Sequence, residues 1–147
     1  IAHGAVAELA AYSVCRPEVK YGERSRIDFL LTGEGLPDLY LEVKNVHFSR
    51  TPGLAEFPDC PTDRGARHLA ELSSMIAAGH RAAMLYLVRR SDCGRMALAA
   101  DLDPKYAAAF ALARTAGVEA LCYDCTVTTQ EIVLRQALPI VPASDLL

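Results

Sequence analysis

The sequence predicts an α/β domain with a mixed central sheet flanked by helices, and three observations carry this prediction. Residues 25–31 and 39–46 are two strand-like runs separated by turn formers. Residues 82–88 form a continuous apolar run of strand length, as in a central strand covered on both faces. Helix-capping signals near residues 62 and 103 lie on either side of this run. Hairpin strands combined with strand–helix alternation are typical of an α/β domain.

Length and composition agree with one folded domain. The chain has 147 residues, close to the roughly 150 of an average domain. Hydrophobic residues make up 52% and charged residues 22%, which excludes disordered and low-complexity chains. The longest apolar run, residues 106–113, is far shorter than the roughly 20 residues that span a bilayer, so no membrane partner is expected. The chain opens on Ile1 and a short first helix, which indicates part of a longer protein.

The N-terminal half is expected to be mostly extended. Residues 1–11 predict a short helix, and an extended pattern follows from residue 19 to residue 46. Residues 32–38 (TGEGLPD) contain two glycines, a proline and an aspartate, which are turn formers, so they predict a hairpin. Residues 49–61 contain three prolines and are expected to form a loop.

Two helices are predicted from their caps. Residues 62–63 can cap a helix that runs to about Ala78, and Gly79 ends it. Asp103-Pro104 is a cap followed by proline at the first helical position, and Gly117 ends that helix. The core-facing stripe of the first helix has i, i+3, i+7 spacing and consists of Leu69, Leu72 and Ile76. Two further strand candidates follow the second helix, at residues 118–123 and 127–134.

Strand alternation brings charged residues of the hairpin together. Glu42 and Lys44 share one face of the second strand, and Arg26 and Asp28 share one face of the first together with a leucine at position 30. If the hairpin folds about Gly35, position 28 lies opposite position 42. The sequence therefore predicts that Asp28, Glu42 and Lys44 lie on one face of adjacent strands.

Two carboxylates with a nearby lysine suit the cleavage of phosphodiesters. Asp28 and Glu42 can hold Mg²⁺ or Mn²⁺, hard cations that prefer oxygen ligands. Such an ion polarises a phosphoryl oxygen and activates a bound water, while Lys44 can orient that water and offset the charge that develops on the phosphate. The alternative is an exposed face with a cross-strand ion pair worth a few tenths of a kcal/mol, and spacing alone favours this alternative.

Several sequence blocks resemble the sugar fermentation stimulation protein family. In order, they are YGERSRIDFLL, YLEVKNVHF, FPDCPTDRGARHLAEL, GHRAAMLYLVRR and DLDPKYAAAFALARTAGVE. The resemblance covers nearly the whole chain, from about Pro17 to Ile140. Family members resemble the PD-(D/E)xK (restriction-endonuclease-like) nuclease superfamily in their C-terminal domain, which follows a small OB-like barrel. The resemblance implies that residues 1–147 are this nuclease-like domain and that the barrel is missing here.

The resemblance also implies roles for individual residues. Asp28 falls on the first acidic position of the superfamily, and Glu42 and Lys44 fall on its E-x-K. Ile27 stands where the name of the superfamily leads one to expect a proline. Related nuclease folds place a polar residue from the helix after the E-x-K strand at the metal site. This favours a functional role for the polar side chains of the helix predicted at residues 62–78.

The family is described as DNA-binding and as a regulator linked to maltose metabolism in a prokaryotic cytoplasm. We therefore expect a DNA-binding protein with a Mg²⁺- or Mn²⁺-dependent phosphodiester-hydrolysing site. The alternative is a non-catalytic DNA-binding regulator of sugar metabolism whose nuclease-like site is vestigial. A third candidate is a metal-dependent phosphoesterase that acts on small nucleotides. The sequence leaves open the strand type, the sequence preference and whether the protein is a homo-oligomer.

Further polar residues are candidates for the site. Arg64, His68 and Glu71 recur at i, i+4, i+7, so that Arg64 can hold a phosphate oxygen and His68 can take part in catalysis by proton transfer. The alternative is a partly solvated polar stripe. Glu18 and Glu8 are candidates for an additional acid.

The charge distribution argues for a local nucleic-acid contact. The formal net charge is −3, which argues against coating nucleic acid by bulk charge and for weak DNA binding by this domain alone. Residues 64–95 nevertheless contain six arginines against two acidic residues, and a nuclease groove needs such basic groups. The candidate contacts are Arg26, Arg64 and Arg67. The alternative is that the arginines reflect a GC-rich genome.

The five cysteines, which are scattered and odd in number, fit a reduced cytoplasm better than a disulfide framework. Cys122 and Cys125 form a lone C-x-x-C, whereas a zinc site needs a second pair of ligands. Chance spacing is the better account of this pair.

Overall fold

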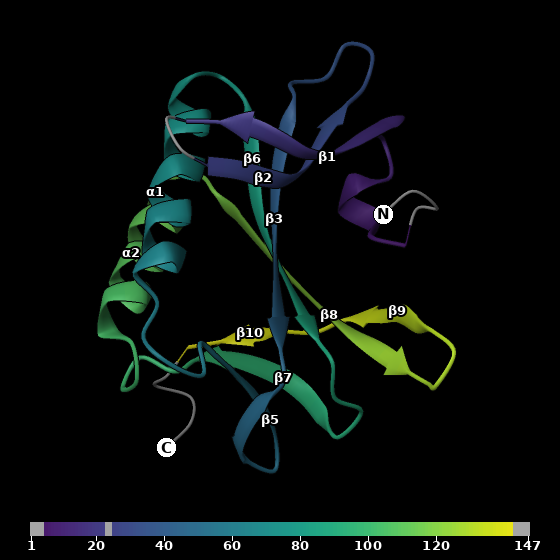
Figure 1. Ribbon diagram of the computed structural model, residues 1–147, viewed down its shortest axis with the longest axis vertical. Coiled ribbons are helices and arrows are strands. Elements are labelled where there is room, and N and C mark those ends of the chain that lie inside the picture. Colours follow the sequence, from purple (N-terminus) through teal and green to yellow (C-terminus); the bar gives the residue numbers. More distant parts are fainter. Residues whose placement is uncertain (1–4, 23–24, 143–147) are drawn as a thin grey trace.

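The computed structural model describes residues 5–22 and 25–142, which form two sheets, two α-helices and a short 3₁₀ helix (Figure 1). The helices are η1 (Ala7–Leu9), α1 (Asp63–Ala77) and α2 (Pro104–Ala116). The strands are β1 (Val14–Tyr21), β2 (Ser25–Thr32), β3 (Leu39–Val46), β4 (Phe48–Thr51), β5 (Gly53–Phe57), β6 (Arg81–Val88), β7 (Cys93–Leu98), β8 (Glu119–Val127), β9 (Ile132–Ala137) and β10 (Ile140–Val141).

The larger sheet is mixed, as predicted. Its order is β1-β2-β3-β6-β8-β9, in which β3, β6 and β8 are parallel to one another and the outer strands are antiparallel to their neighbours. Helices α1 and α2 cover one face, and η1 lies on the other (Figure 1). The smaller sheet, of order β10-β7-β5-β4, adds side chains to the core on the helix side. The fold class is therefore an α/β domain with a mixed central sheet.

The predicted hairpin register is confirmed where β2 and β3 pair. Phe29 lies opposite Leu41 and Leu31 lies opposite Leu39, which is the register of a turn centred on Gly35. Gly35 has φ +72°, a left-handed conformation that costs glycine little. The central position of β6 is also confirmed, since it pairs with β3 on one side and β8 on the other.

The predicted alternation along β2 is wrong on the N-terminal side of Asp28. Ile27 and Leu30 both belong to the core beneath the helices, whereas Leu31 belongs to the core beneath η1 and Phe29 packs against that second core. Strict alternation would have placed Ile27 with Leu31. The ladder with β3 ends at Phe29, so Asp28 stands where β2 changes the face that it presents to the helices.

Several predicted elements need correction. Among the described residues, the first helix is only the 3₁₀ turn η1, and residues 1–4 of that prediction lie outside the described range. The expected loop over residues 49–61 contains most of β4 and all of β5, because its first proline occupies the turn between them and the others follow β5. Strand β7 was not predicted. Strand β8 continues to Val127 instead of stopping at 123, because Asp124 is buried within it and accepts hydrogen bonds from β9.

The helix caps are confirmed, and one residue connects them. The Thr62 side chain accepts a hydrogen bond from Gly65 N, and Gly117 ends α2 with φ +104°. Asp103 caps α2 by accepting from Tyr106 N at 2.9 Å, and its other oxygen accepts from Thr62 N at 2.8 Å. The N-termini of both helices are therefore held by a single buried carboxylate. Neither of these two helices is long and apolar enough to cross a membrane.

Candidate functional site

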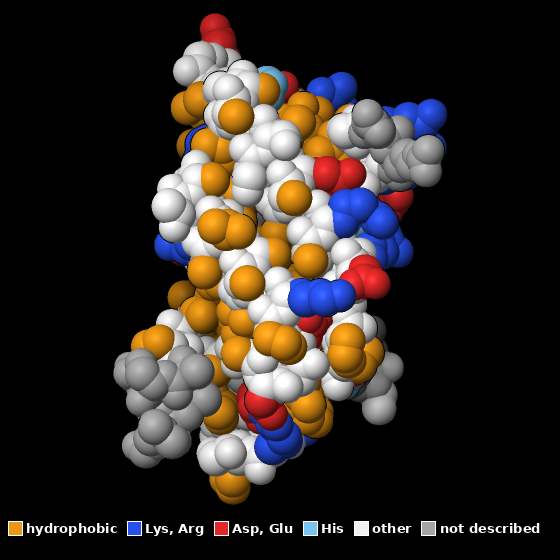
Figure 2. Space-filling model, turned by 90° about the vertical axis from the view of Figure 1, so that its left-hand side faces the viewer, with side chains coloured by type: hydrophobic (Ala, Val, Ile, Leu, Met, Phe, Trp, Pro, Cys, Tyr) orange, Lys and Arg blue, Asp and Glu red, His pale blue; other side chains and the backbone are white. Residues whose placement is uncertain are grey.

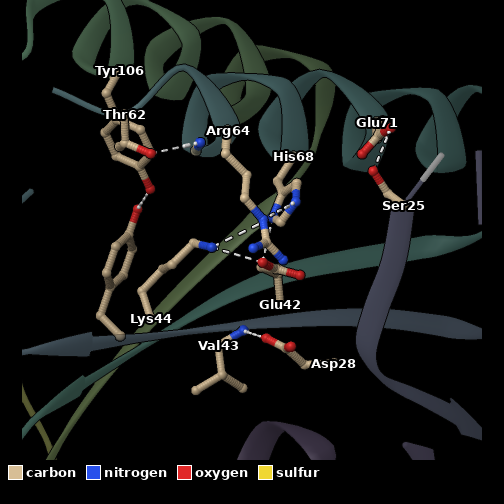
Figure 3. A network of polar contacts seen from close by, with 12 residues as sticks. Ser25, Asp28, Glu42, Val43, Lys44, Thr62, Arg64, His68, Glu71 and Tyr106 are labelled. Carbon is tan, nitrogen blue, oxygen red and sulfur yellow. Dashed lines mark hydrogen bonds and ion pairs between the residues drawn. The ribbon is translucent and has the colours of Figure 1, made fainter. Parts of the chain in front are cut away.

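The structure brings Asp28, Glu42 and Lys44 together beside the first turns of α1 (Figure 3). All three side chains border a cavity of about 390 Å³, which the segment from Phe57 to Cys60 and the start of α1 enclose on the other side. A larger cavity, about 570 Å³, lies between α2 and β7, β8 and β10, is mainly apolar and shares no residue with this one. The chemistry-bearing residues therefore gather at the smaller cavity.

Glu42 is a buried carboxylate that two other side chains of the site contact. Its side chain is 3% exposed, and its Oε1 accepts hydrogen bonds from Lys44 Nζ at 2.7 Å and from His68 Nδ1. Its Oε2 is buried and has no hydrogen-bond partner among the described residues. Burial opposes ionisation of Glu42, but the hydrogen bonds from His68 and Lys44 and the charge of Lys44 outweigh it and hold the pKa of Glu42 below its usual value. Glu42 is thus an ionised carboxylate with one oxygen still available.

His68 connects Glu42 to Arg64 along one face of α1. Arg64 Nε donates to His68 Nε2 at 3.3 Å, so Nε2 is the acceptor and Nδ1 carries the proton that is donated to Glu42. Lys44 Nζ lies 3.4 Å from the same Nδ1. Because the imidazole is only 2% exposed, His68 fixes the positions of its two neighbours instead of reaching into the cavity.

Asp28 supplies the second carboxylate. Its Oδ2 accepts the backbone N–H of Val43 at 2.7 Å, so the side chain is held against β3. Burial is the largest influence on Asp28 and raises its pKa, and the charge of Glu42 adds to this, while the Val43 N–H and Lys44 oppose it. Two carboxylates that border one cavity repel each other, and a cation between them would relieve that repulsion.

The donor set fits a cation that keeps some of its water. Within residues 5–22 and 25–142, no group of three or more His, Cys, Asp or Glu side chains is arranged to hold a metal ion. A site that binds through Asp28 and Glu42 therefore needs oxygen ligands of another kind, such as water, a backbone carbonyl or substrate. Mg²⁺ is commonly bound in this way, through one or two carboxylates and retained water, and the unpartnered Glu42 Oε2 offers a ligand atom for it.

The other predicted site residues take different positions. Arg26 Nη1 donates to the backbone oxygen of Glu18 at 2.9 Å, which holds Arg26 along β1. Glu18 is exposed and lies between Pro17 and Val19, which pair with Phe29 and Ile27, and its charge contributes to the raised pKa of Asp28. Arg67 is exposed on α1, whereas Glu8 accepts from Tyr123 OH of the other core and does not join the cavity.

Sequence reasoning missed two polar residues that lie near this site. Ser25 Oγ donates to Glu71 Oε1 at 2.8 Å, and Tyr21 is paired with Ser25 across the β1–β2 ladder. Ser25 faces α1 because β2 changes the face that it presents near Asp28, and Tyr21 on β1 pairs with it, which strict alternation along β2 does not foresee. Only the helical spacing of Glu71 from His68 indicated this part of the site.

The two cysteines of the C-x-x-C pair do not border the cavity of the candidate site. Cys122 and Cys125 are both buried in β8. Burial raises the pKa of the Cys122 thiol to about 12, and burial also raises the pKa of Cys125. Both thiols therefore resist forming the thiolate that metal binding or redox exchange requires.

Comparisons with known proteins point to one family. Residues 1–131 match the family model described as the sugar fermentation stimulation protein RE domain. A sugar fermentation stimulation protein homolog from Dinoroseobacter shibae is 59% identical over 99% of this chain and 59% of its own length. A homolog from Roseobacter denitrificans is 58% identical over 92% of this chain and 57% of its own length. The chain thus spans about three fifths of these relatives.

A solved structure has the same fold. It is described as the structure of Pyrococcus furiosus SfsA in complex with Ca²⁺, and it superposes with a TM-score of 0.83 at 28% sequence identity. The similarity covers 92% of this chain and 58% of that one.

Proposed function

The chain belongs to the sugar fermentation stimulation protein family, and from this premise we propose that it binds DNA and hydrolyses phosphodiester bonds with Mg²⁺ or Mn²⁺. The observation that carries the proposal is the geometry of Glu42. Lys44 and His68 hold one of its oxygens, while the other is buried, ionised and without a hydrogen-bond partner in the described part of the chain. An unpartnered carboxylate oxygen is costly to bury unless a cation or water completes it.

Asp28 and Glu42 would hold the ion. When bound, a divalent ion polarises a phosphoryl oxygen and lowers the pKa of a coordinated water. The relative from Pyrococcus furiosus was solved with Ca²⁺, a hard cation that prefers the same oxygen ligands. This supports a cation site in the family and motivates the choice of Mg²⁺ and Mn²⁺ for the test.

The remaining residues of the cavity have separate tasks in this proposal. Lys44 keeps 17% of its side chain exposed, so that its ammonium can orient the attacking water and offset charge on the phosphate. Arg64 uses Nε for His68, which leaves its two terminal nitrogens for phosphate oxygens. His68 acts as a positioning residue for Glu42 and Arg64, because its ring is buried.

DNA would be held by local contacts. Figure 2 shows charged side chains of both signs mainly on the right half of the face formed by the helices, and fewer charged side chains on its left half. Such a mixed surface with a net charge of −3 supports weak binding through a few arginines, among them Arg64 and Arg67. Because the chain covers about three fifths of its relatives, strong DNA affinity is proposed for the longer protein and its remaining part. The proposed compartment is the bacterial cytoplasm.

The test is cleavage of linear, circular and single-stranded DNA with Mg²⁺ or Mn²⁺. We expect Asp28→Ala and Lys44→Ala each to lower the cleavage rate by about 10²–10³-fold, the usual cost of removing one transition-state contact. Glu34→Gln, a change in the exposed β2–β3 turn, is the matched control and should cleave as wild type does. Cleavage that survives both site substitutions would contradict the assignment.

One observation favours a second candidate, a non-catalytic DNA-binding regulator of sugar metabolism. Lys44 Nζ is already paired with Glu42 Oε1 at 2.7 Å. In this candidate the ammonium group neutralises Glu42 and does not contact a water or a phosphate. DNA binding without cleavage under either metal would favour this candidate over the hydrolase.

A further inference from the structure

Three buried oxygen atoms near the site have no hydrogen-bond partner among the described residues. They are Tyr21 OH, Glu42 Oε2 and Glu71 Oε2. Tyr21 is 5% exposed and the Glu42 side chain 3% exposed, so bulk water does not complete their hydrogen bonds. Buried polar atoms without partners are rare, and each needs an explanation.

The three atoms belong to one part of the molecule. Tyr21 is paired with Ser25, whose Oγ donates to Glu71 Oε1 at 2.8 Å. The ring of Tyr21 packs against that of Tyr40 with centroids 5.8 Å apart, and Tyr40 precedes Glu42 by two positions on the same strand face. Figure 3 shows Ser25 and Glu71 beside Glu42 on the side away from Lys44.

A count of protons shows that these atoms cannot satisfy one another. An ionised carboxylate only accepts hydrogen bonds, whereas a phenol donates one. Tyr21 has a single hydroxyl proton, so it can complete one carboxylate oxygen and no more. One donor is therefore available for two unpartnered carboxylate oxygens, Glu42 Oε2 and Glu71 Oε2. At least one oxygen needs a cation or a water from outside the chain.

We propose that Tyr21, Ser25 and Glu71 form an outer shell that binds the water ligands of the divalent cation held by Asp28 and Glu42. This inference rests on the proposed metal site and adds three residues to it. Glu71 accepts hydrogen bonds from the water ligands, Ser25 fixes the Glu71 carboxylate, and Tyr21 takes part with its hydroxyl. The shell explains why a site with two carboxylates suffices, since water ligands remain on the ion and are oriented by the protein.

The proposed shell has a consequence for the choice of metal. Mg²⁺ gives up its water reluctantly and keeps an octahedral set, whereas Ca²⁺ accepts more ligands and a looser geometry. An acceptor such as Glu71 that binds water instead of the ion therefore favours a strongly hydrated ion. Outer-shell partners of metal sites typically contribute about 10–100-fold in affinity.

The test measures affinity and not cleavage. Mg²⁺, Mn²⁺ and Ca²⁺ are titrated separately by calorimetry into the full-length protein and its Glu71→Gln, Tyr21→Phe, Ser25→Ala and Asp28→Asn variants. We expect Glu71→Gln to weaken Mg²⁺ binding about 10-fold and to weaken Ca²⁺ binding less. Tyr21→Phe should weaken Mg²⁺ binding measurably, and Asp28→Asn should abolish Mg²⁺ binding. Glu34→Gln removes an equal charge from the exposed β2–β3 turn and should leave all three affinities unchanged.

The outcomes separate this inference from the proposed function. If Asp28→Asn abolishes binding while Glu71→Gln and Tyr21→Phe bind Mg²⁺ as wild type does, the outer shell is wrong and the metal site stands. If the wild type binds none of the ions, both are wrong. Tyr21→Phe and Ser25→Ala keep the charge of Glu71, so they test the shell even where Glu71→Gln fails to fold.

Discussion

Asp28 accepts the backbone N–H of Val43 at 2.7 Å at the point where β2 stops pairing with β3. In a continued ladder that N–H would face the backbone of Ile27, so the carboxylate takes the place of the next backbone partner. The proposed metal ligand is therefore also part of the sheet, and its two tasks can be separated by choosing the substitution.

Asp28→Asn should keep the sheet and lose the metal. An amide oxygen still accepts the Val43 N–H, so we expect the free energy of unfolding to change by less than about 0.5 kcal/mol without metal. Asp28→Ala leaves that N–H without its acceptor and should cost about 1 kcal/mol. In wild type, Mg²⁺ at a hundred times its Kd should add about 2.7 kcal/mol, and neither variant should show this gain. Chemical denaturation with and without Mg²⁺ measures both effects, and equal stabilisation of wild type and Asp28→Asn would contradict the ligand role.

His68→Leu should destabilise the protein by about 1–3 kcal/mol. The substitution removes a hydrogen bond to the buried Glu42 and leaves the Arg64 guanidinium without its acceptor. Arg67→Ala, on the exposed side of the same helix, is the control and should change stability by less than about 0.5 kcal/mol. Denaturant titration of both variants measures the free energy of unfolding. Equal decreases in the two variants would contradict the role of His68 in positioning Glu42 and Arg64.

Gly65→Ala should disturb the start of α1. A Cβ atom there would lie 2.8 Å from Thr62 Cγ2 and 3.0 Å from the ring of Tyr106, which is buried and donates or accepts a hydrogen bond with Tyr86 OH at 2.6 Å. Neither neighbour can easily move, so overpacking should cost about 1–3 kcal/mol and lower the metal affinity by shifting Arg64 and His68.

Gly94→Ala is the matched control for this change, because nothing lies within 4 Å of its added Cβ. We expect it to fold and bind metal as wild type does. A Gly65→Ala variant as stable as Gly94→Ala would mean that α1 has room to relax.

Acid unfolding should depend on Asp124. Burial opposes its ionisation, but hydrogen bonds from Arg135 and from Gln136 N hold the pKa of Asp124 below its usual value. A lowered carboxyl pKa contributes stability that is full above the unfolded pKa of about 3.9 and is lost as pH falls through the folded value.

Arg135→Ala should therefore raise the pH of acid unfolding and cost about 1–3 kcal/mol at pH 7. Lys105→Ala removes an exposed cation 3.9 Å from Asp63 and should do neither. Circular dichroism between pH 5 and pH 2 checks the prediction, and identical acid midpoints for Arg135→Ala and wild type would refute it.

The sequence was most informative where local rules act alone. Turn formers around Gly35 predicted the β2–β3 register, and capping residues predicted the starts of both α1 and α2. The same register predicted that Asp28, Glu42 and Lys44 border one site. These features depend on contacts between residues that are close in sequence.

The sequence was least informative where distant contacts override a local rule. The prolines that suggested a loop occupy the turn before β5 and the segment after it, so they do not interrupt the strand. The strand predicted at residues 118–123 continues through Asp124, which is buried because Arg135 on β9 donates hydrogen bonds to it. Ser25 reaches α1 because β2 changes the face that it presents near Asp28, where a side chain replaces a backbone partner, and Tyr21 on β1 pairs with Ser25.

The carboxylate of Asp103 has a consequence for the order of folding. The β2–β3 hairpin needs only residues already close in the chain, but the start of α1 is held through Thr62 by a residue 41 positions later. During synthesis, the half of the site that carries Asp28 and Glu42 can thus form before the half that carries Arg64 and His68 is fixed. Long-range contacts form late because their loops must close first. The proposed site would therefore be complete only after the start of α2 has been synthesised, so the proposed metal binding would follow the formation of most of the domain.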